Sequence, residues 1–544
     1  MKLQKMYEHI VDSNLCVENK LNYQSVIDLI IDRLHTNSDD NLFIDCTLNR
    51  KWTKKQVLDS SLNFAYYLIN DCKLAKGEII CFVTQNSDIH AIGIIGSLAA
   101  GLVYCCQPHH STESEIRDNV SKIKPSVLVC YEQNVEQVIN IANSFPFVKK
   151  ILMTDKPQDN SEHNIDFPIS LENIFTIERD YQFKLPVNSQ LTETATFVLS
   201  SGSTGQPKAI IKTNKNLLST VEALAHREIS KLTPNDIMLS SNFCHISGQR
   251  CLLSTIDGNA QLAIIRVDED LEDVYHNIHK YNITTAFLIP TQLNYLAKHC
   301  DTIDKNYLKS LKDVVTGAAS LSETTYRCIV DKFAFEKFRI CYGMSEVGWV
   351  TQTPLCEIKN VDNNCIVGKV VPNTQIKIID ENGKSLPANT SGQICIGGEQ
   401  VTPGYLENKE ENEKLFTADG YLKSGDIGYY DDNHFIYIVG RIKDVINVER
   451  VIVRPAELES ILLSHRDVMN TAVIGVKDEE RIEVPMAFVT VVNGSQVTPK
   501  ELIDYVDSRV NYYKKLRGGL KILEAFPMTS LKKINKSELR RLYT

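Results

Sequence analysis

One segment near position 200 constrains the fold of this chain most, because it combines small hydroxyl side chains, glycines and a lysine. Its residues are Leu199, Ser200, Ser201, Gly202, Ser203, Thr204, Gly205, Gln206, Pro207 and Lys208. The preceding residues 194–198 are β-branched and apolar, which predicts a strand. Glycines let the backbone approach phosphate oxygens, amides and hydroxyls donate hydrogen bonds, and a lysine adds positive charge. The segment therefore predicts a strand that leads into a polyphosphate-binding loop.

This loop differs from the Walker A loop, in which four residues separate the glycines and the sequence ends in Gly-Lys-Ser/Thr. Here two residues separate Gly202 from Gly205, and Pro207 precedes the lysine. A loop of this composition alone is more often a surface turn. The phosphate-binding interpretation therefore depends on the rest of the chain.

The segment and the motifs after it resemble those of the adenylate-forming superfamily, which includes acyl-CoA synthetases, adenylation domains and beetle luciferases. The phosphate loop of that family reads approximately Thr-Ser-Gly-Ser/Thr-Thr-Gly-x-Pro-Lys-Gly. This chain matches it with Ser200 in the first place and Ala209 in the last. The family's Thr-His-x-Asn-Leu corresponds here to Thr213, Asn216 and Leu217. Further motifs recur in the family's order, so the resemblance covers most of the chain.

A chain of 544 residues is too long for one hydrophobic core and predicts at least two domains. Helix-like and strand-like segments alternate through the first 350 residues, which favours α/β layers with parallel sheets. Residues 365–440 contain short alternating runs split by Gly and Asn turns, which predicts a β-rich subdomain. The tail contains two expected helices and two expected strands, at residues 455–463, 500–510, 471–476 and 487–492.

The predicted fold class is therefore α/β, with two layered α/β sheets and the β-rich subdomain in an N-terminal core, residues 1–440. Residues 444–544 are expected to form a small, mobile α+β C-terminal domain. The resemblance implies a hinge near Lys443.

Charge and cysteine content narrow the functional class. A net charge of -9, with scattered lysines and arginines, argues against nucleic acid as the main partner. The 15 cysteines include no Cys-x-x-Cys pair and no zinc spacing, which favours reduced thiols in a cytoplasmic protein. The apolar run 91–106 contains Gly93, Gly96 and Gly101 and is short for a membrane span. It predicts a buried helix followed by a strand.

The resemblance implies which residues bind ATP and Mg²⁺. The family motif Tyr-Gly-x-Thr/Ser-Glu corresponds to residues 342–346. By resemblance, Glu346 helps hold Mg²⁺, Ser345 contacts the α-phosphate and Tyr342 flanks the adenine. Magnesium prefers oxygen ligands and commonly shares a carboxylate with substrate phosphates. The small side chains at Gly317 and Ala318 would leave a slot for the adenine ring.

Two further motifs concern the ribose. Asp426 lies in a Ser-Gly-Asp sequence that matches the family's ribose-binding motif. A carboxylate can accept hydrogen bonds from both hydroxyls of a diol. Without that context, Ser-Gly-Asp is more often a β-turn. By resemblance, Arg441 is a second ribose or phosphate ligand.

The C-terminal segment 527–536 resembles the family motif Pro-x-Thr-x-x-Gly-Lys-Ile/Val-x-Arg/Lys. There the lysine bridges the carboxylate and the α-phosphate as charge develops. The resemblance assigns this catalytic role to Lys533, with Lys532 as the competing register.

Residues near 245 are expected to form the acyl pocket. His245 matches a family position where an aromatic residue or histidine gates that pocket, although a lone histidine among apolar residues is more often part of the core. Amino-acid-activating members have an Asp directly after an aromatic residue, whereas Cys244 follows Phe243 here. An uncompensated buried ammonium costs several kcal/mol. The predicted substrate is therefore an aryl or aliphatic carboxylic acid without an α-amino group.

The expected reaction forms an acyl adenylate and pyrophosphate, and then transfers the acyl group to a thiol of coenzyme A or of a separate carrier protein. Arg450 replaces a typical glycine of the family, and Lys532 replaces the glycine before the catalytic lysine, so the chain departs from the family pattern at residues that concern the thiol step. Three alternatives stay open: a ligase that uses an amine, a luciferase-like oxygenase and an inactive nucleotide-binding regulator. The presence of Lys533, Glu346 and Asp426 disfavours the last.

Overall fold

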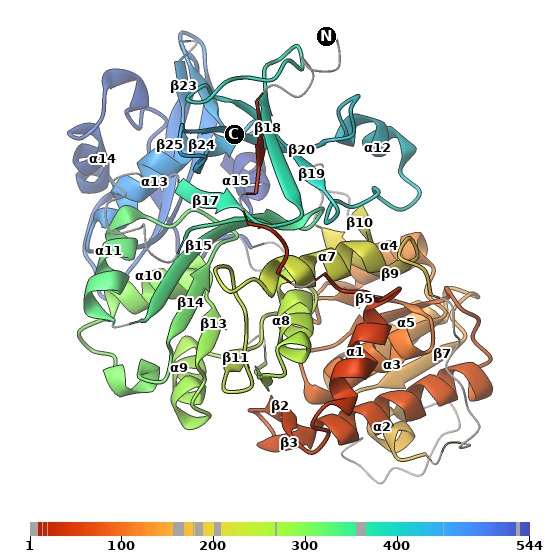
Figure 1. Cartoon of the computed structure of the whole chain (residues 1–544). Helices are drawn as coiled ribbons and strands as arrows, with labels where there is room; N and C mark the ends of the chain where they lie inside the picture. The colour runs from red at the N-terminus through yellow and green to blue at the C-terminus, as the bar shows by residue number, and fades with distance from the viewer. Residues whose placement is uncertain are drawn as a thin grey trace.

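The structure is a computed structural model, in which three sheets carry helices on their faces (Figure 1). The residues that it describes are 9–13, 15–18, 20–155, 168–177, 179, 189–200, 208–266, 269–333, 335–354, 366–449, 451–528 and 534–543.

The first sheet has seven strands in the order β10-β9-β5-β4-β6-β7-β8. Its strands are β4 (Ile79–Val83), β5 (Val103–Gln107), β6 (Val127–Cys130), β7 (Lys150–Met153), β8 (Ile169–Ser170), β9 (Thr194–Ser200) and β10 (Lys208–Thr213). The neighbouring helices are α2 (Lys54–Tyr66), α3 (Asp88–Ala99), α4 (Glu113–Ile123), α5 (Val135–Ala142), α6 (Leu171–Phe175) and α7 (Asn214–Leu224). Only β10 runs antiparallel to its neighbour in this sheet.

The structure confirms the helix and the strand that were expected in the apolar run 91–106. Every residue of α3 is buried, and β5 follows it. Because both elements lie inside the first sheet and its helical layer, hydrophobic packing explains the run. Among the helices that the structure describes, none combines the length and the apolar composition that crossing a bilayer requires.

The second sheet has fourteen strands in the order β1-β18-β19-β20-β21-β17-β16-β15-β14-β13-β11-β12-β2-β3. Its β-rich end contains β1 (Ile10–Asp12), β16 (Gly348–Gln352), β17 (Ile366–Val370), β18 (Thr374–Ile379), β19 (Gly392–Gly398), β20 (Leu422–Tyr430) and β21 (Ile436–Arg441). The other end contains β2 (Asn41–Asp45), β3 (Arg50–Thr53), β11 (Ile237–Leu239), β12 (Gln261–Ile264), β13 (Thr285–Phe287), β14 (Asp313–Thr316) and β15 (Lys337–Met344). The accompanying helices are α1 (Val26–His35), α8 (Ile246–Asp257), α9 (Leu271–Lys280), α10 (Pro290–Lys298), α11 (Glu323–Lys332) and α12 (Lys409–Leu415).

The β-rich region is continuous with the second α/β sheet. Strand β16 pairs with β15 on one side and with β17 on the other, both antiparallel. The strands from β17 to β21 therefore extend the same hydrogen-bonded sheet. As a result, motifs on β15 and on β20 belong to one connected framework.

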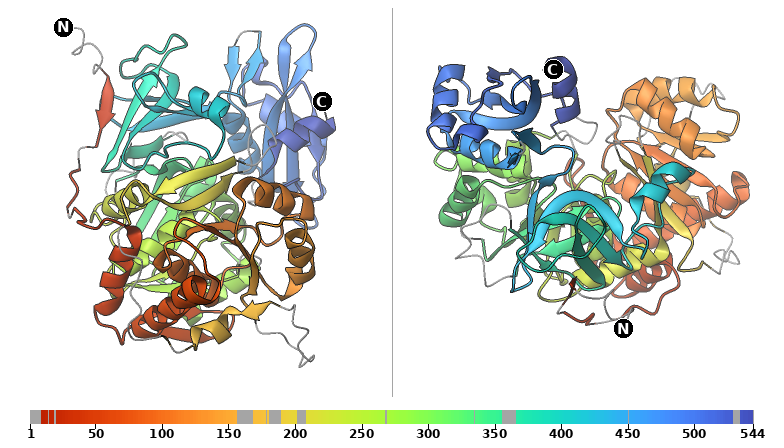
Figure 2. Two further views of the ribbon diagram at one scale, coloured as in Figure 1. Left: turned by 90° about the vertical axis from the view of Figure 1, so that its right-hand side faces the viewer. Right: turned by 90° about the horizontal axis from the view of Figure 1, so that it is seen from above.

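The third sheet belongs to the C-terminal lobe, which contains the described residues from 446 onward. Its strands are β22 (Ile446–Val448), β23 (Val451–Val453), β24 (Val468–Asp478), β25 (Ile482–Val491) and β26 (Leu520–Ile522). Its helices are α13 (Pro455–Ser464), α14 (Pro499–Asp507) and α15 (Lys536–Tyr543). Viewed from above in Figure 2, this lobe (blue) and helices α4 and α5 (orange) lie on opposite sides of the β-rich strands.

Helix α10 contacts the C-terminal lobe through Lys298. Its Nζ donates hydrogen bonds to the carbonyl oxygens of Leu463, at 3.1 Å, and His465, at 2.8 Å. These carbonyls end α13, where a helix has acceptors without partners in the helix and where positive charge is favourable. Lys298 therefore caps a helix of the other lobe.

The cysteines that the structure describes are all free thiols, and most are buried. Cys300 and Cys328 approach within 3.7 Å, a hydrogen-bond distance for sulfur and not a covalent bond. Burial raises the pKa of the Cys130 thiol to about 12 and that of Cys341 also to about 12. These thiols therefore remain protonated, as small apolar packing groups.

Candidate active site

The phosphate-loop residues Ser201, Gly202, Ser203, Thr204 and Gly205 lie outside the described residues, but the structure describes both ends of the segment. Ser200 ends β9 and Lys208 begins β10, and the two residues are paired across the antiparallel ladder.

Lys208 is held at the end of that segment by two contacts. Its Nζ donates to a carboxylate oxygen of Glu411 on α12, and it lies 4.9 Å from the ring centroid of Tyr405. Its side chain is 11% exposed. The ammonium group is therefore positioned next to the predicted phosphate loop before any nucleotide binds.

Three residues from separate sequence motifs meet at the β-rich end of the second sheet. The phenol of Tyr342, on β15, donates a hydrogen bond to Oδ2 of Asp426, on β20, at 2.6 Å. Arg441, opposite Asp426 on β21, forms an ion pair with Oδ1 at 3.2 Å. The sheet thus brings together the residues that were assigned to adenine and to ribose.

The electrostatics of this group suit a site for polar ligands. Burial raises the pKa of Asp426, while the charge of Arg441 and the hydrogen bond from Tyr342 oppose that shift. Burial and the neighbouring carboxylate raise the pKa of Tyr342 well above its ordinary value. The phenol of Tyr342 therefore stays a hydrogen-bond donor, and Asp426, which accepts from that phenol and pairs with Arg441, presents the acceptor oxygens that ribose hydroxyls require.

Glu346 lies in the tight turn between β15 and β16, together with Ser345. Its Oε1 accepts a hydrogen bond from the phenol of Tyr405 at 2.9 Å. The turn needs a glycine at 343, because a Cβ there would lie 2.1 Å from the carbonyl oxygen of Gly348. Tyr405 thus contacts Glu346 and also lies beside Lys208.

A single carboxylate in this position fits the way proteins bind magnesium. Mg²⁺ usually takes one or two protein carboxylates and completes its shell with phosphate oxygens and water. Within the described part of the chain, no three His, Cys, Asp or Glu side chains gather into a metal site. A magnesium ion at Glu346 would therefore depend on the phosphates of the nucleotide.

Lys212 contacts the turn that carries Glu346, and the sequence motifs did not indicate this lysine. Its Nζ donates to the carbonyl oxygens of Glu346 at 3.1 Å, Val347 at 2.8 Å and Gln400 at 3.2 Å. Burial lowers the pKa of Lys212 to about 7, against the opposing charge of Glu346. The signal available in the sequence was a lysine within an otherwise apolar predicted strand. In the structure this strand is β10, and Lys212 is 1% exposed.

Gly317 and Ala318 follow β14 at its carboxyl end. A Cβ at Gly317 would lie 2.6 Å from Sγ of Cys341, so only glycine fits there. Ala318 is exposed and has a φ of 69°, a left-handed conformation that costs a residue with a Cβ roughly 1–2 kcal/mol. Such strain is typical of functional sites, and the small side chain leaves this strand end open.

His245 precedes α8, whose first residue is Ile246. The preceding Cys244 is buried, and its backbone N–H donates to Oδ1 of Asn242 at 2.9 Å. Burial raises the pKa of the Cys244 thiol far above its ordinary value. Cys244 therefore has no negative charge to offer an ammonium group.

Lys533, which was assigned to catalysis of adenylate formation, and its competing register Lys532 lie outside the described residues, as does Arg450, which concerns the thiol step. The positions on each side of the lysine segment are held together, because Met528 and Ile534 form an isolated bridge. Burial lowers the pKa of Lys443, and among its neighbours the charge of Lys208 acts in the same direction. The linker between the lobes therefore lies within electrostatic range of the phosphate segment.

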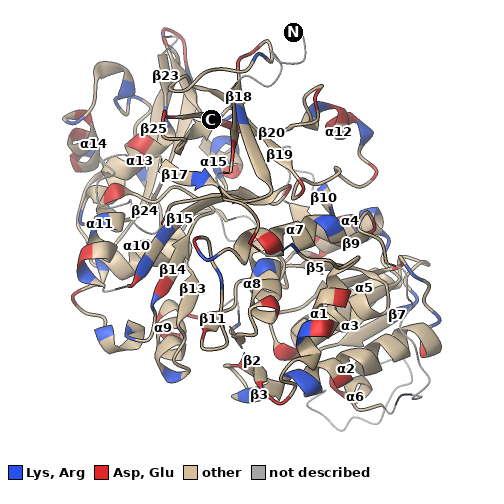
Figure 3. Ribbon diagram, in the orientation of Figure 1, with Lys and Arg blue, Asp and Glu red and all other residues tan. Residues whose placement is uncertain are grey.

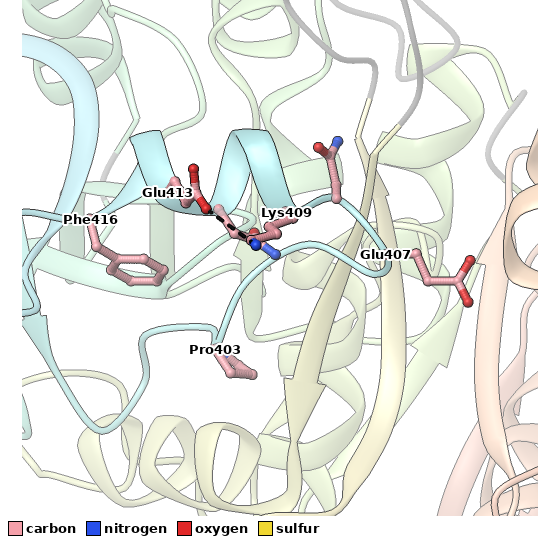
Figure 4. A pocket seen from close by; sticks show the side chains of 7 residues that line it. Pro403, Glu407, Lys409, Glu413 and Phe416 are labelled. Atoms are coloured by element: carbon pink, nitrogen blue, oxygen red, sulfur yellow. Dashed lines mark ion pairs between the residues drawn. The ribbon is translucent and has the colours of Figure 1, made fainter.

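A separate hollow beside α12 contains none of the predicted site residues. Figure 4 shows its lining side chains: Pro403, Glu407, Asn408, Lys409, Asn412, Glu413 and Phe416. Lys409 and Glu413 form an ion pair across one turn at 4.0 Å, and Figure 3 shows both signs of charge on this helix. Exposed, mutually paired charges at this hollow do not make a nucleotide site.

Two layered α/β sheets, a β-rich extension with a buried carboxylate and a small α+β lobe define the adenylate-forming class of enzymes. The sequence model described as AMP-binding enzyme matches residues 32–406, and that described as AMP-binding enzyme C-terminal domain matches residues 457–533. The chain belongs to this family and is therefore an ATP-binding, adenylate-forming enzyme.

Relatives and solved structures agree with this assignment. The chain is 29% identical over 471 residues to luciferin 4-monooxygenase of Photinus pyralis, covering 85% of this chain and 84% of that protein. It is 30% identical over 476 residues to 4-coumarate–CoA ligase 4 of Arabidopsis thaliana, covering 86% and 82%. ATP-bound MatB from Rhodopseudomonas palustris has a TM-score of 0.83 at 21% identity and covers 95% of this chain and 98% of its own. The last comparison supports the fold.

Proposed function

We propose that the protein converts a carboxylic acid without an α-amino group, together with ATP, into an acyl adenylate and then into a thioester. In the first step, a carboxylate oxygen bonds to the α-phosphorus, and the bond from that phosphorus to the oxygen bridging the β-phosphate breaks, which releases pyrophosphate. In the second step, a thiol sulfur bonds to the acyl carbon, AMP leaves with the acyl oxygen, and the thiol proton passes to solvent.

The observation that carries this proposal is the meeting of Tyr342, Asp426 and Arg441 on three strands of one sheet. Adenine would pack beside Tyr342, and the ribose hydroxyls would donate to Asp426. Preorganised donors and charges of this kind are the largest source of catalysis in such reactions.

Lys208 and Glu346 would handle the phosphates. Lys208 neutralises phosphate charge directly, and Glu346 would hold Mg²⁺, which shields the phosphate oxygens from the attacking carboxylate. Lys212 stabilises this site, because its three hydrogen bonds hold the backbone around Glu346 in place. Lys212 is therefore a positioning residue.

The absence of an α-amino group in the substrate follows from the Cys244 region. A buried neutral thiol leaves an ammonium group without a counter-charge there. Since an unpaired buried charge costs several kcal/mol, α-amino acids should be rejected.

Coenzyme A or the phosphopantetheine of a carrier protein would supply the thiol after the C-terminal lobe rotates about Lys443. Pyrophosphate release across a panel of acids, with and without coenzyme A, tests both halves. We expect pyrophosphate release with carboxylic acids that have no α-amino group, and thioester formation only when the thiol is present. Highest activity with an α-amino acid would refute the substrate proposal, and acyl transfer only to an amine would refute the proposed acceptor.

Two lysine variants test the proposed catalytic residue. Lys533→Ala should lower adenylate formation about 100-fold or more, since this lysine is proposed to bridge the carboxylate and the α-phosphate. Lys532→Ala is the matched control and should retain most activity. Equal losses in the two variants would contradict the assignment.

A further inference from the structure

Arg250 is a buried arginine within α8, five residues after His245. It is 4% exposed. Its guanidinium carbon lies 4.0 Å from the ring centroid of Trp349 on β16, and its Nη2 donates to Oγ of Ser230 at 3.2 Å. These contacts place the guanidinium between α8 and the second sheet.

Most of its hydrogen-bonding capacity is unused. Nε and Nη1 of Arg250 are buried and have no hydrogen-bond partner, and the same holds for Nε1 of Trp349 beside it. Guanidinium and indole nitrogens are donors only, and buried donors without acceptors are rare in folded proteins. These donors of Arg250 and Trp349 therefore have no acceptor in the described part of the fold.

Charge is unbalanced in the same place. The carboxylate whose negative charge acts on Arg250 is that of Asp313, on β14. Both oxygens of Asp313 already bind Arg339, through Nε at 3.1 Å and through Nη2. Asp313 is thus paired with Arg339, and no ion pair within the described residues neutralises the charge of Arg250.

The position of Arg250 connects it with the reaction. Trp349 follows Glu346 by three residues, and Cys341, whose thiol titration the charge of Arg250 influences, directly precedes Tyr342. On the other side, α8 begins directly after His245. The guanidinium therefore lies between the strands that carry the nucleotide motifs and the helix assigned to the acyl pocket.

We propose that Arg250 binds a second carboxylate, at the far end of the acid substrate, so that the enzyme acts on dicarboxylic acids. This inference rests on the proposed acyl-adenylate function. A carboxylate supplies both the missing acceptors and the missing negative charge, and arginine binds carboxylates through charge-assisted hydrogen bonds. Bound water would supply acceptors but would leave the charge unbalanced.

The test compares acids of equal chain length that have one or two carboxylates, from four to ten carbons, by the rate of pyrophosphate release. Wild type should show kcat/KM about 100-fold or more higher for the best dicarboxylic acid than for its monocarboxylic partner. Arg250→Gln should reduce that ratio to within a few-fold of one, and Arg250→Lys should keep part of it.

Arg227→Gln is the control, because it removes an arginine whose side chain is 77% exposed and should leave the ratio unchanged. An equal or higher rate with monocarboxylic acids in wild type, or an unchanged ratio in Arg250→Gln, would overturn the inference. Pyrophosphate release with no acid at all would instead overturn the proposed function.

If Arg250→Gln does not fold, two other measurements still test whether Arg250 binds a second carboxylate. Dicarboxylic acids should raise the melting temperature of the wild-type protein, whereas their monocarboxylic partners should not. Trp349→Phe keeps an aromatic ring but removes the indole N–H, and it should lower the dicarboxylate preference several-fold. Equal thermal shifts from both acids, which would indicate water alone at Arg250, refute the proposal.

Discussion

Lys212 shows how a single buried charge can organise an active-site turn. Its ammonium group donates to three carbonyl oxygens, two of them in the turn that carries Glu346. Sequence motifs indicated Glu346 but not Lys212, because the lysine acts through residues more than 130 positions away. Tyr405 was missed for the same reason, since its contacts to Glu346 and Lys208 exist only in the folded chain.

The pKa of Lys212 predicts a pH-dependent stability difference. Because the folded-state pKa of about 7 lies below the ordinary lysine value of 10.5, the folded protein binds fewer protons than the unfolded chain between these values, and stability rises with pH. Wild type should therefore lose stability relative to Lys212→Met as pH falls from 10 to 7, by at most about 1.4 kcal/mol per pH unit. Urea denaturation at several pH values measures it.

Lys215→Met serves as the control, because that lysine is 46% exposed and pairs with Glu399 at the surface. Its difference from wild type should vary little over the same range. A constant difference for Lys212→Met would show that its ammonium group keeps an ordinary pKa in the fold.

At the level of elements, local patterns predicted the helices and strands better than the pairings between them. Strand β24 and helix α13 confirm the expected strand and helix, although β24 extends further at both ends. The sequence did not indicate that β17 joins β16 and so extends the second sheet. That pairing depends on tertiary packing, which no local periodicity records.

Helix α8 is positioned by close backbone contact at Gly248. A Cβ there would lie 2.1 Å from the carbonyl oxygen of Asn242, in the segment that leads to His245. Gly248→Ala should therefore destabilise the protein by about 1–3 kcal/mol, despite the better helix propensity of alanine. It should also raise KM for the acid more than KM for ATP, as steady-state kinetics would show.

Ser254→Ala, in the same helix, is a suitable comparison. It removes a buried hydroxyl without a hydrogen-bond partner, so it should be neutral or stabilising. If Gly248→Ala is as stable as this control, close packing at residue 242 does not position α8.

At the level of the whole molecule, the two lobes contact each other where Lys298 of α10 meets the end of α13. Resemblance to a family was sufficient to predict the α/β fold class and to select Tyr342 and Asp426, whose side chains the structure brings into contact. It could not predict the contact of α10 with α13, because neither partner belongs to a motif.

Lys298→Met should loosen the C-terminal lobe, since it removes two hydrogen bonds from an ammonium group, each worth about 1.5–3 kcal/mol. We expect limited proteolysis near Lys443 to become several-fold faster, while Lys309→Met, on the surface of the same lobe as Lys298, should leave the rate unchanged. Identical rates in the two variants would mean that Lys298 does not restrain the lobe.

The three-residue strand β1 pairs with β18, so Ile10–Asp12 lie against Gln375–Lys377. The outer edge of the second sheet is thus formed by residues that are synthesised hundreds of positions before their partner strand. Until that partner emerges, the early strand has nothing to pair with, and a fragment that starts after residue 12 would display a bare, aggregation-prone sheet edge. Variants that lack residues 1–12 should therefore precipitate, while the part that stays in solution should keep its catalytic activity.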